Sequence, residues 1–470
     1  MKKFLVSVGL AAAGTASLHA TYAPELGSFG ATKMWSISAD LRGFYDDNYT
    51  TGANKTGSYG FEFSPQLELT MPMQQTELGM RYTYGLYYFQ QREELGVNAF
   101  DQSHDLDLWL DHAFSPRWEV RMRDTFIVGQ EPALLNPNPA VTQPYRVAGN
   151  NIVNTASINL STVWTPRFST SLTYNNTLTD YENSGAGLDD LQPTGPLLPL
   201  GGGLYILNPF VGSAKGDGPS LAGVNNRVDQ SVSLDFQWLF ATETLAFFGV
   251  QFEQVNYIAD EPVAFNLAAE EYYLLYGKNN PSLGPVYYYS SDRDNRSYTA
   301  YIGFTHSLLP NLNISAKAGA QYSETYNDPL SSPSIGPYAV MSAVYTYRPG
   351  SYVQIGFSQM LNATDVVAPD PTSGKLTLDQ ESSVAFAAIT HRLTPKLSGT
   401  VIGNWQYSTF QEGEYSGAAD ISYTLSANLS YSFSPHFSAS AGYNFYDLQS
   451  NIYQRGYSRN QVYIDVWAAY

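Results

Sequence analysis

The sequence contains no cysteine, has few charged residues and has no apolar run long enough for a membrane-spanning helix. The missing cysteine excludes disulfides, thiolate zinc sites and cysteine nucleophiles. Charged residues make up 14% of the 470 positions, against about a quarter in an average soluble domain. The mean hydropathy of −0.24 excludes a helical membrane protein. An aromatic content of 14% is too high for a disordered chain.

The first twenty residues predict a targeting segment. Two lysines precede an apolar stretch over residues 4–14, and "SLHA" places small residues at Ser17 and Ala20. This pattern is typical of a cleaved secretory signal peptide at residues 1–20, and its apolar stretch is too short to span a bilayer. Without those two lysines the formal charge is 22 − 42 = −20, which argues against nucleic acid or anionic lipid as a partner.

The remaining sequence alternates apolar and polar residues with a period of two. In "ISYTLSANLSYSFS", residues 421–434, every odd position is apolar and every even position is polar. Such a pattern predicts a long β-strand with one apolar and one polar face. "VSLDFQWLF" and "YGFEFSPQLELTM" repeat it, and residues 265–277 are the only short helix candidate.

A proline corner recurs between these strands, flanked by apolar residues that are four positions apart. Pro at the second position of a type I turn fits a three-residue hairpin loop. These tight turns alternate with long polar connections and bound about eighteen strands, with starts near residues 34, 58, 77, 103, 118, 151, 168, 227, 245, 295, 312, 337, 351, 380, 397, 419, 437 and 460. The corners are Phe114–Trp118, Trp164–Phe168, Leu308–Leu312, Leu393–Leu397 and Phe433–Phe437.

This organisation predicts an all-β fold: a transmembrane antiparallel β-barrel of about 18 strands (16–20 by this count), with short turns at one end and long loops at the other. The spacing of the corners also suits a β-propeller, but its blade motifs are missing. A soluble β-sandwich has shorter strands and mixed turns at both ends. We therefore divide the chain into a signal peptide (1–20), a short periplasmic segment (21–33) and the barrel (34–470).

Both ends of the predicted barrel resemble known outer-membrane proteins. The last strand, "QVYIDVWAAY", is similar to the terminal strand that the bacterial barrel-assembly machinery recognises, through Tyr470 and the alternating Ala468, Val466, Ile464 and Val462. The opening "LRGFYDDNYTTG" and "SYGFEFSPQLEL" resemble the putative β-barrel porin family of bacterial outer membranes. The resemblance implies location in the outer membrane and passage of small hydrophilic solutes. It implies outer-membrane lipid and the assembly machinery as partners and leaves a homotrimer open.

Charged residues alternate by strand on the face predicted to line the lumen. Cross-strand pairing of Glu68 with Arg81 and of Asp111 with Arg121 follows from symmetric turns, and opposite charges across a sheet stabilise it by about 0.2–1 kcal/mol per pair. The ladder either satisfies charges facing a wet lumen or orients polar solutes. Asp124 falls on the lipid face. The ladder comprises Glu62, Glu68, Arg81, Asp105, Asp107, Asp111, Arg121 and Arg123.

We expect other residues to lie at the barrel rims and in the loops. The corner aromatics are expected to form a periplasmic girdle of Phe114, Trp118, Trp164, Phe168, Phe433 and Phe437. His104, near Asp101 and Asp105, is the only histidine beside an outer loop with acids close by, and the five histidines outside the signal scatter over different strands. We therefore expect no catalytic, cofactor-binding or metal site, and no enzyme activity.

The third, fourth and fifth outer loops along the chain are long, and the fourth is apolar at its centre. It contains "LLPLGGGLYILNPF", and we expect residues 197–210 to pack inward or over the barrel mouth rather than stay in water. The third loop covers about 129–151 and the fifth about 259–294. The alternative to a channel is therefore a structural or adhesive barrel whose loops seal the lumen and present an acidic outer surface.

Overall fold

The computed structural model describes residues 34–130, 150–182, 197–201, 204–207, 219–328, 330–452 and 455–470. The predicted signal peptide and the segment 21–33 lie outside these residues. Within them, no helix is both long enough and apolar enough to cross a membrane.

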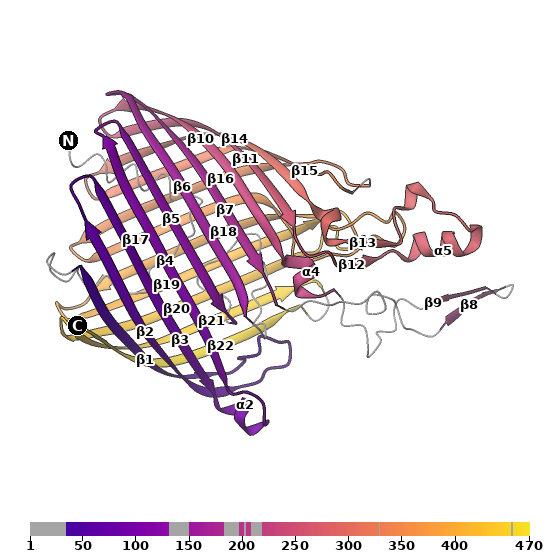
Figure 1. Cartoon of the computed structure of the whole chain (residues 1–470), viewed down its shortest axis with the longest axis horizontal. Helices are drawn as coiled ribbons and strands as arrows, with labels where there is room; N and C mark the ends of the chain where they lie inside the picture. The colour runs from indigo at the N-terminus through magenta and orange to yellow at the C-terminus, as the bar shows by residue number, and fades with distance from the viewer. Residues whose placement is uncertain are drawn as a thin grey trace.

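Eighteen antiparallel strands form one closed barrel (Figure 1), in which the last strand pairs with the first. The predicted barrel is confirmed, and every strand begins within three residues of its predicted start. The strands are β1 (Trp35–Asp46), β2 (Ser58–Pro72), β3 (Thr76–Phe89), β4 (Phe100–Ser115), β5 (Trp118–Gly129), β6 (Asn151–Thr165), β7 (Phe168–Asp180), β10 (Arg227–Ala241), β11 (Thr244–Tyr257), β14 (Asn295–Leu309), β15 (Leu312–Thr325), β16 (Ser334–Arg348), β17 (Ser351–Ala363), β18 (Asp379–Arg392), β19 (Leu397–Gln411), β20 (Ala419–Ser434), β21 (Phe437–Ser450) and β22 (Tyr457–Ala469).

The two faces of the sheet differ as the alternation predicts. On β10, Phe236 and Trp238 are exposed on the outer surface, whereas Arg227 and Gln237 are buried on the inner one. Successive side chains of a strand point to opposite sides, so closing the sheet places one set against lipid and the other in the lumen. The lipid-facing side is therefore apolar and the lumen side largely polar.

Several aromatic rings on the lumen side lie against glycines of the neighbouring strand. Gly79 pairs with Trp109 and Gly442 pairs with Tyr463. A Cβ atom at either glycine would lie 2.0–2.3 Å from the ring. Gly249 with Tyr301 and Gly356 with Phe386 repeat the arrangement. Covering glycine with a cross-strand ring strengthens a curved sheet, and it keeps these rings against the wall.

Four of the five proline corners are tighter than predicted, whereas the corner Leu393–Leu397 keeps its register and fits the predicted three-residue loop. Pro116 and Arg117 alone form the turn between β4 and β5, and Phe114 is a bulge that has no cross-strand partner. A three-residue loop is therefore wrong here; a two-residue turn with a β-bulge replaces it. The bulge occurs in six hairpins, always at an apolar or aromatic residue: Phe114, Trp164, Phe240, Leu308, Tyr347 and Phe433.

The opposite end carries the long connections. The predicted helix is confirmed as α5 (Leu267–Tyr276), which Gly277 ends in the left-handed conformation. The other elements here are α2 (Gln90–Glu94), β8 (Leu197–Gly201), β9 (Leu204–Leu207), α4 (Leu221–Asn225), β12 (Pro262–Phe265), η1 (Pro281–Leu283), β13 (Tyr287–Tyr289) and η2 (Ser290–Arg293).

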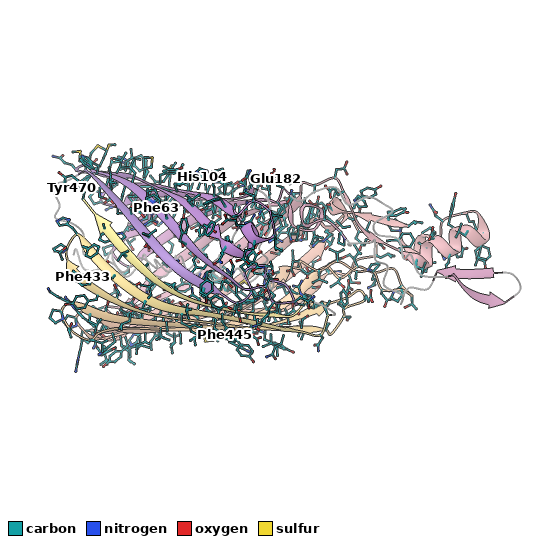
Figure 2. The ribbon with its side chains drawn as sticks, turned by 90° about the horizontal axis from the view of Figure 1, so that it is seen from below. Phe63, His104, Glu182, Phe433, Phe445 and Tyr470 are labelled. Atoms are coloured by element: carbon teal, nitrogen blue, oxygen red, sulfur yellow. The ribbon has the colours of Figure 1, made fainter. Side chains whose placement is uncertain are left out.

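The apolar centre of the fourth loop does not fold back into the barrel. Strands β8 and β9 pair as a hairpin, which lies beyond the end of the barrel in both Figure 1 and Figure 2. The expectation that this segment packs inside or over the mouth is therefore wrong for residues 197–201 and 204–207. The rest of it, up to residue 210, and most of the third loop lie outside the described residues.

Candidate functional site

Most charged residues of β2 to β5 lie on the lumen side, and several of them form ion pairs along one wall. The guanidinium of Arg81 contacts Asp107, its direct partner on β4. Both Nη atoms of Arg123 donate to Asp111, at 2.7 and 2.8 Å. The Thr125 hydroxyl also donates to Asp107, at 2.8 Å. We call Arg81, Asp107, Asp111 and Arg123 the charged strip.

The predicted strand register is confirmed, but the ion pairs differ from the predicted pairs. Glu68 lies opposite Arg81 and Asp111 lies opposite Arg121. Each arginine nevertheless turns away: Arg81 binds Asp107, and Arg121 binds Glu119 at 2.7 Å on its own strand. Arg81 has a register partner on each side, and Arg123 reaches Asp111 diagonally. Register alone therefore could not identify the pairs.

Barrel closure adds a pair that sequence analysis missed. Arg42 on β1 binds Glu62 at 3.1 Å and lies over the Tyr463 ring of β22 at 4.6 Å. Arg42 shares a face with Asp40, two residues away, which was the available signal. Among the described residues, Glu68 and Asp105 form no ion pair.

Asp124 lies on the outer surface, as predicted, and has a polar neighbour. The amide of Asn154 donates to its carboxylate at 2.8 Å. Its pairing row runs perpendicular to the strands and is polar on most of the strands that follow, so Asp124 belongs to a polar row on the outer surface of these strands. No bulge is needed to explain it. That row is Asp124, Ala156, Asn176, Gln230, Gln254, Arg296 and Glu324.

The corner aromatics gather at the short-turn end. The Trp118 and Trp164 rings are 5.6 Å apart, and those of Phe433 and Phe437 are 5.3 Å apart. Tyr470 lies at this end with Phe433 (Figure 2), 73% exposed, with its ring 6.1 Å from Trp35. Phe114 contacts His112, and Phe168 contacts Trp238. Of the terminal strand, Val462, Ile464 and Val466 are exposed on the outer surface.

His104 lies apart from the acids that sequence analysis placed near it. It faces the outer surface, where its Nδ1 is 2.8 Å from the Tyr82 hydroxyl. Asp101 is buried, and Arg92 binds it at 2.6 Å. Among the described residues, no group of three or more metal-ligating side chains comes together.

Loops from several strands fold together at the outer mouth. The buried side chains of Val263, Tyr288 and Leu376 form the centre of an apolar cluster, which joins β12 and β13 to the segment 364–378 after β17. The Tyr288 hydroxyl donates to the carbonyl of Gly374 at 2.6 Å. We call α4, β12, β13 and residues 364–378 the outer cap.

Two buried arginines connect the outer cap. Arg293, 1% exposed, donates to the carbonyl of Val224 in α4 at 2.6 Å and to the carbonyl of Thr364. Arg455, before β22, donates to Asp420 on β20 at 2.7 Å and to both oxygens of Asp365 at 2.8 and 2.9 Å. Residues 364–378 are therefore tied to both sides of the mouth. Sequence analysis missed both arginines because Val224, Thr364 and Asp365, which they bind, are 69–90 residues away.

The cap also contains acids in contrasting environments. Hydrogen bonds from the Thr372 hydroxyl and from the backbone and hydroxyl of Ser373 lower the pKa of Asp370 to about 2. Burial instead raises the pKa of Asp328. An acceptor surrounded by donors favours the charged form, and burial favours the neutral form. Asp370 is therefore a charged turn residue on the outside of the cap.

With this geometry established, the chain can be compared with known proteins. Residues 289–470 match the model of the family described as "Putative beta-barrel porin 2". The match contains β14 to β22, including the terminal strand ending at Tyr470, and it confirms the resemblance there. The opening strands that also carried the resemblance lie before the matched residues.

Solved outer-membrane barrels show similarity over most of the chain. The ferric enterobactin receptor of Pseudomonas aeruginosa matches at 10% identity with a TM-score of 0.44, covering 92% of this chain and 81% of that one. OccAB4 of Acinetobacter baumannii and the outer membrane protein OpdK of Pseudomonas aeruginosa each match at 8% identity with a TM-score of 0.41, covering 93% of this chain and 99% of theirs. No curated protein matches the chain. Residues 289–470 therefore resemble a porin family, and the chain has the fold of a closed antiparallel β-barrel.

Proposed function

We propose that the barrel passes small hydrophilic solutes by passive diffusion. The observation that carries this proposal is the polar inner face of a closed 18-stranded barrel, since barrels of 16–18 strands leave an aqueous channel unless loops fill them. In this proposal, the charged strip attracts permeating ions to one side of the lumen. The outer cap narrows the entrance of the channel. The proposal assigns no catalytic activity, cofactor or metal.

The same proposal includes delivery by a cleaved signal peptide at residues 1–20 and recognition of the terminal strand by the barrel-assembly machinery. The exposed aromatics of the short-turn end support insertion of the delivered barrel into a membrane, because aromatic side chains collect at membrane interfaces. The ladder residues would then line the aqueous path, and the girdle residues would contact lipid. Exposed apolar side chains all around the outer surface allow either a lipid-surrounded monomer or the homotrimer.

One observation favours the alternative of a loop-sealed structural barrel. The outer cap ties loops from opposite parts of the barrel through buried arginines. A cap without an opening would block diffusion through the lumen. The protein would then act through its acidic outer surface, as a structural or adhesive barrel.

Single-channel recording in planar bilayers tests the proposal directly. We expect steady ion conductance from the purified folded barrel, and swelling of liposomes that contain it when small sugars are added. A folded barrel that conducts no ions would contradict free diffusion and favour the sealed alternative.

A further inference from the structure

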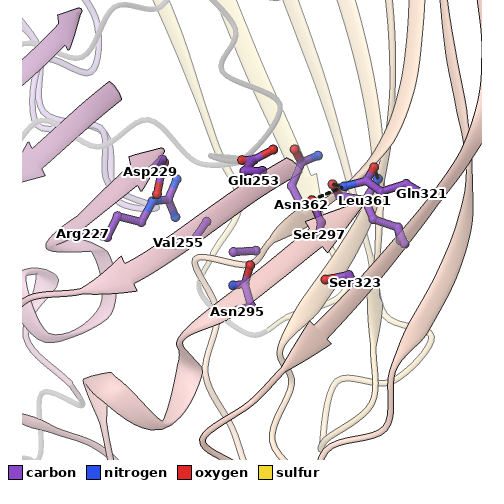
Figure 3. Close-up of a pocket in the computed structure, with 11 residues that line it drawn as sticks. Arg227, Asp229, Glu253, Val255, Asn295, Ser297, Gln321, Ser323, Leu361 and Asn362 are labelled. Carbon is purple, nitrogen blue, oxygen red and sulfur yellow. Dashed lines mark hydrogen bonds and ion pairs between the residues drawn. The ribbon is translucent and has the colours of Figure 1, made fainter. Parts of the chain in front are cut away.

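A polar pocket lies in the inner wall beneath the outer cap. Its cavity volume is about 30 Å³, and it is lined from β10, β11, β14, β15 and β17. One water molecule needs about 10–15 Å³ of such volume, so the pocket takes one or two hydroxyl-sized groups of a larger solute. Figure 3 shows Arg227 and Asp229 at one side of it and Asn362 near Gln321 at the other. It lies along the path of the solutes of the proposed function.

Several buried polar atoms in this pocket have no hydrogen-bond partner within the described part of the chain. They are Nη1 of Arg227, Oδ1 of Asp229 and Nδ2 of Asn362. Arg227 is only 3% exposed, and its Nε donates to Asp229 at 3.1 Å. Buried polar groups in proteins are normally hydrogen-bonded. The three atoms therefore point to a polar ligand.

The strand geometry explains how Asn362 comes to line the pocket. Pairing between β16 and β17 ends at Ala339 and Gln359. Beyond that point Leu361 packs against Gly336, where a Cβ would lie 2.7 Å from its Cγ. The Gln321 amide donates to the Leu361 carbonyl at 2.9 Å and accepts from its N–H at 3.1 Å. This side chain replaces the missing strand pairing and fixes the position of Asn362.

The charges of the pocket decide what kind of ligand it suits. Asp229 and Glu253 outnumber the one guanidinium, so an anion would meet a formal charge of −1. A simple cation would meet Arg227. A neutral solute with several hydroxyl groups fits both the free donors and the free acceptor, because each hydroxyl can donate and accept. Ser297 and Ser323 add further hydroxyl groups to the lining.

We propose that this pocket binds a hydroxyl group of small neutral polyhydroxylated solutes, such as sugars, and so recognises them at the wall of the channel. The inference rests on the proposed function for its role in transport, but binding itself does not require conduction. Solutes that pass the outer cap would pause here before crossing the lumen.

Titration calorimetry of the folded barrel in detergent, with D-glucose as the probe, tests the site. We expect saturable binding, weakened about tenfold by Asn362→Leu, because one hydrogen bond to a ligand hydroxyl contributes roughly that factor. Asn404→Leu makes the same substitution on the lumen side of β19, outside the pocket, and should leave the affinity unchanged. A second variant, Glu253→Gln, removes a carboxylate without changing shape and should weaken binding as well.

The outcomes separate this site from the channel itself. A conducting barrel that binds no glucose would overturn the site and leave the proposed function intact. A barrel that binds glucose but does not conduct would support the site and overturn the proposed function. Saturable binding of L-serine without glucose would mean a site for zwitterions and would also overturn the inference, as would equal weakening by Asn362→Leu and Asn404→Leu.

Discussion

The two ends of the barrel are built in opposite ways. At the short-turn end, short turns connect neighbouring strands, and the bulged aromatics such as Phe114 and Phe433 are exposed. At the outer end, long loops bury arginines and acids, and Arg455 is 7% exposed between Asp365 and Asp420. One end depends on contacts within a hairpin, and the other depends on contacts between distant loops.

The difference shows where this chain can change at low cost. An exposed aromatic at a turn loses little contact when it is replaced, whereas a buried charge leaves its partners without compensation. Mutations at the outer end should therefore have large effects on the closed mouth. Mutations at the short-turn end should leave the folded barrel nearly unchanged.

The largest effect is expected from Arg455→Ala. It removes the guanidinium that binds Asp365 and Asp420, whose side chains are 4% and 1% exposed. Breaking a buried ion pair from one side typically costs about 3–5 kcal/mol. We expect the cap to detach, with higher single-channel conductance and faster proteolysis of residues 364–378.

A compensated variant provides the control for Arg455. Arg455→Ala combined with Asp365→Asn and Asp420→Asn leaves no stranded charge, and it should recover part of the protease resistance. If Arg455→Ala conducts and resists protease as the parent does, the cap does not depend on this ion network, and the contrast between the two ends fails.

A smaller effect is expected in the lumen between the two ends. Arg81→Ala plus Arg123→Ala leaves Asp107 and Asp111 without their cations, so the preference for cations in reversal-potential measurements should rise. Stability should change by less than about 1 kcal/mol, because these pairs face water. Arg121 is not included, since it binds Glu119 instead of the strip.

The matched control removes the same charge from the short turns. Arg117→Ala plus Arg167→Ala changes two exposed arginines outside the lumen, and it should leave the ion preference close to that of the parent. Equal shifts in both double variants would mean that overall charge, rather than the strip, sets the preference.

The same contrast explains how much the sequence could predict. Strand number, strand starts and the pairing of Glu68 with Arg81 follow from local alternation and short turns, and the structure confirms them. The outer cap could not be predicted this way, because Arg293 reaches Thr364 across 71 positions and no periodicity links the two. The bulges at the proline corners were also missed, since a one-residue insertion leaves the flanking pattern intact. Asn362 lines the pocket because β17 stops pairing with β16 at Gln359. The alternation of residues along β17 does not indicate where this pairing ends.

The smallest effect on the folded barrel is expected from deleting Tyr470. The residue is 73% exposed, its ring packs against Trp35, and its N–H donates to the carbonyl of Ile37 at 2.9 Å. An exposed aromatic pair stabilises by about 1 kcal/mol, so thermal unfolding of the purified barrel should hardly change. Assembly in cells should nevertheless slow, because we propose that the terminal aromatic is what the assembly machinery recognises.

The fraction of heat-modifiable, folded barrel after pulse labelling measures that rate. Phe240→Ala is the matched comparison, because Phe240 is a 77% exposed aromatic at the same end but lies in a hairpin instead of the terminal strand. We expect slower assembly only when Tyr470 is removed. Equal assembly rates for the two variants and the parent would contradict recognition of the terminal residue. Equal slowing of both variants would mean that the aromatics of this rim generally promote membrane insertion. The short-turn end would then contribute to the folding rate around its whole circumference, although it contributes little to the stability of the folded barrel.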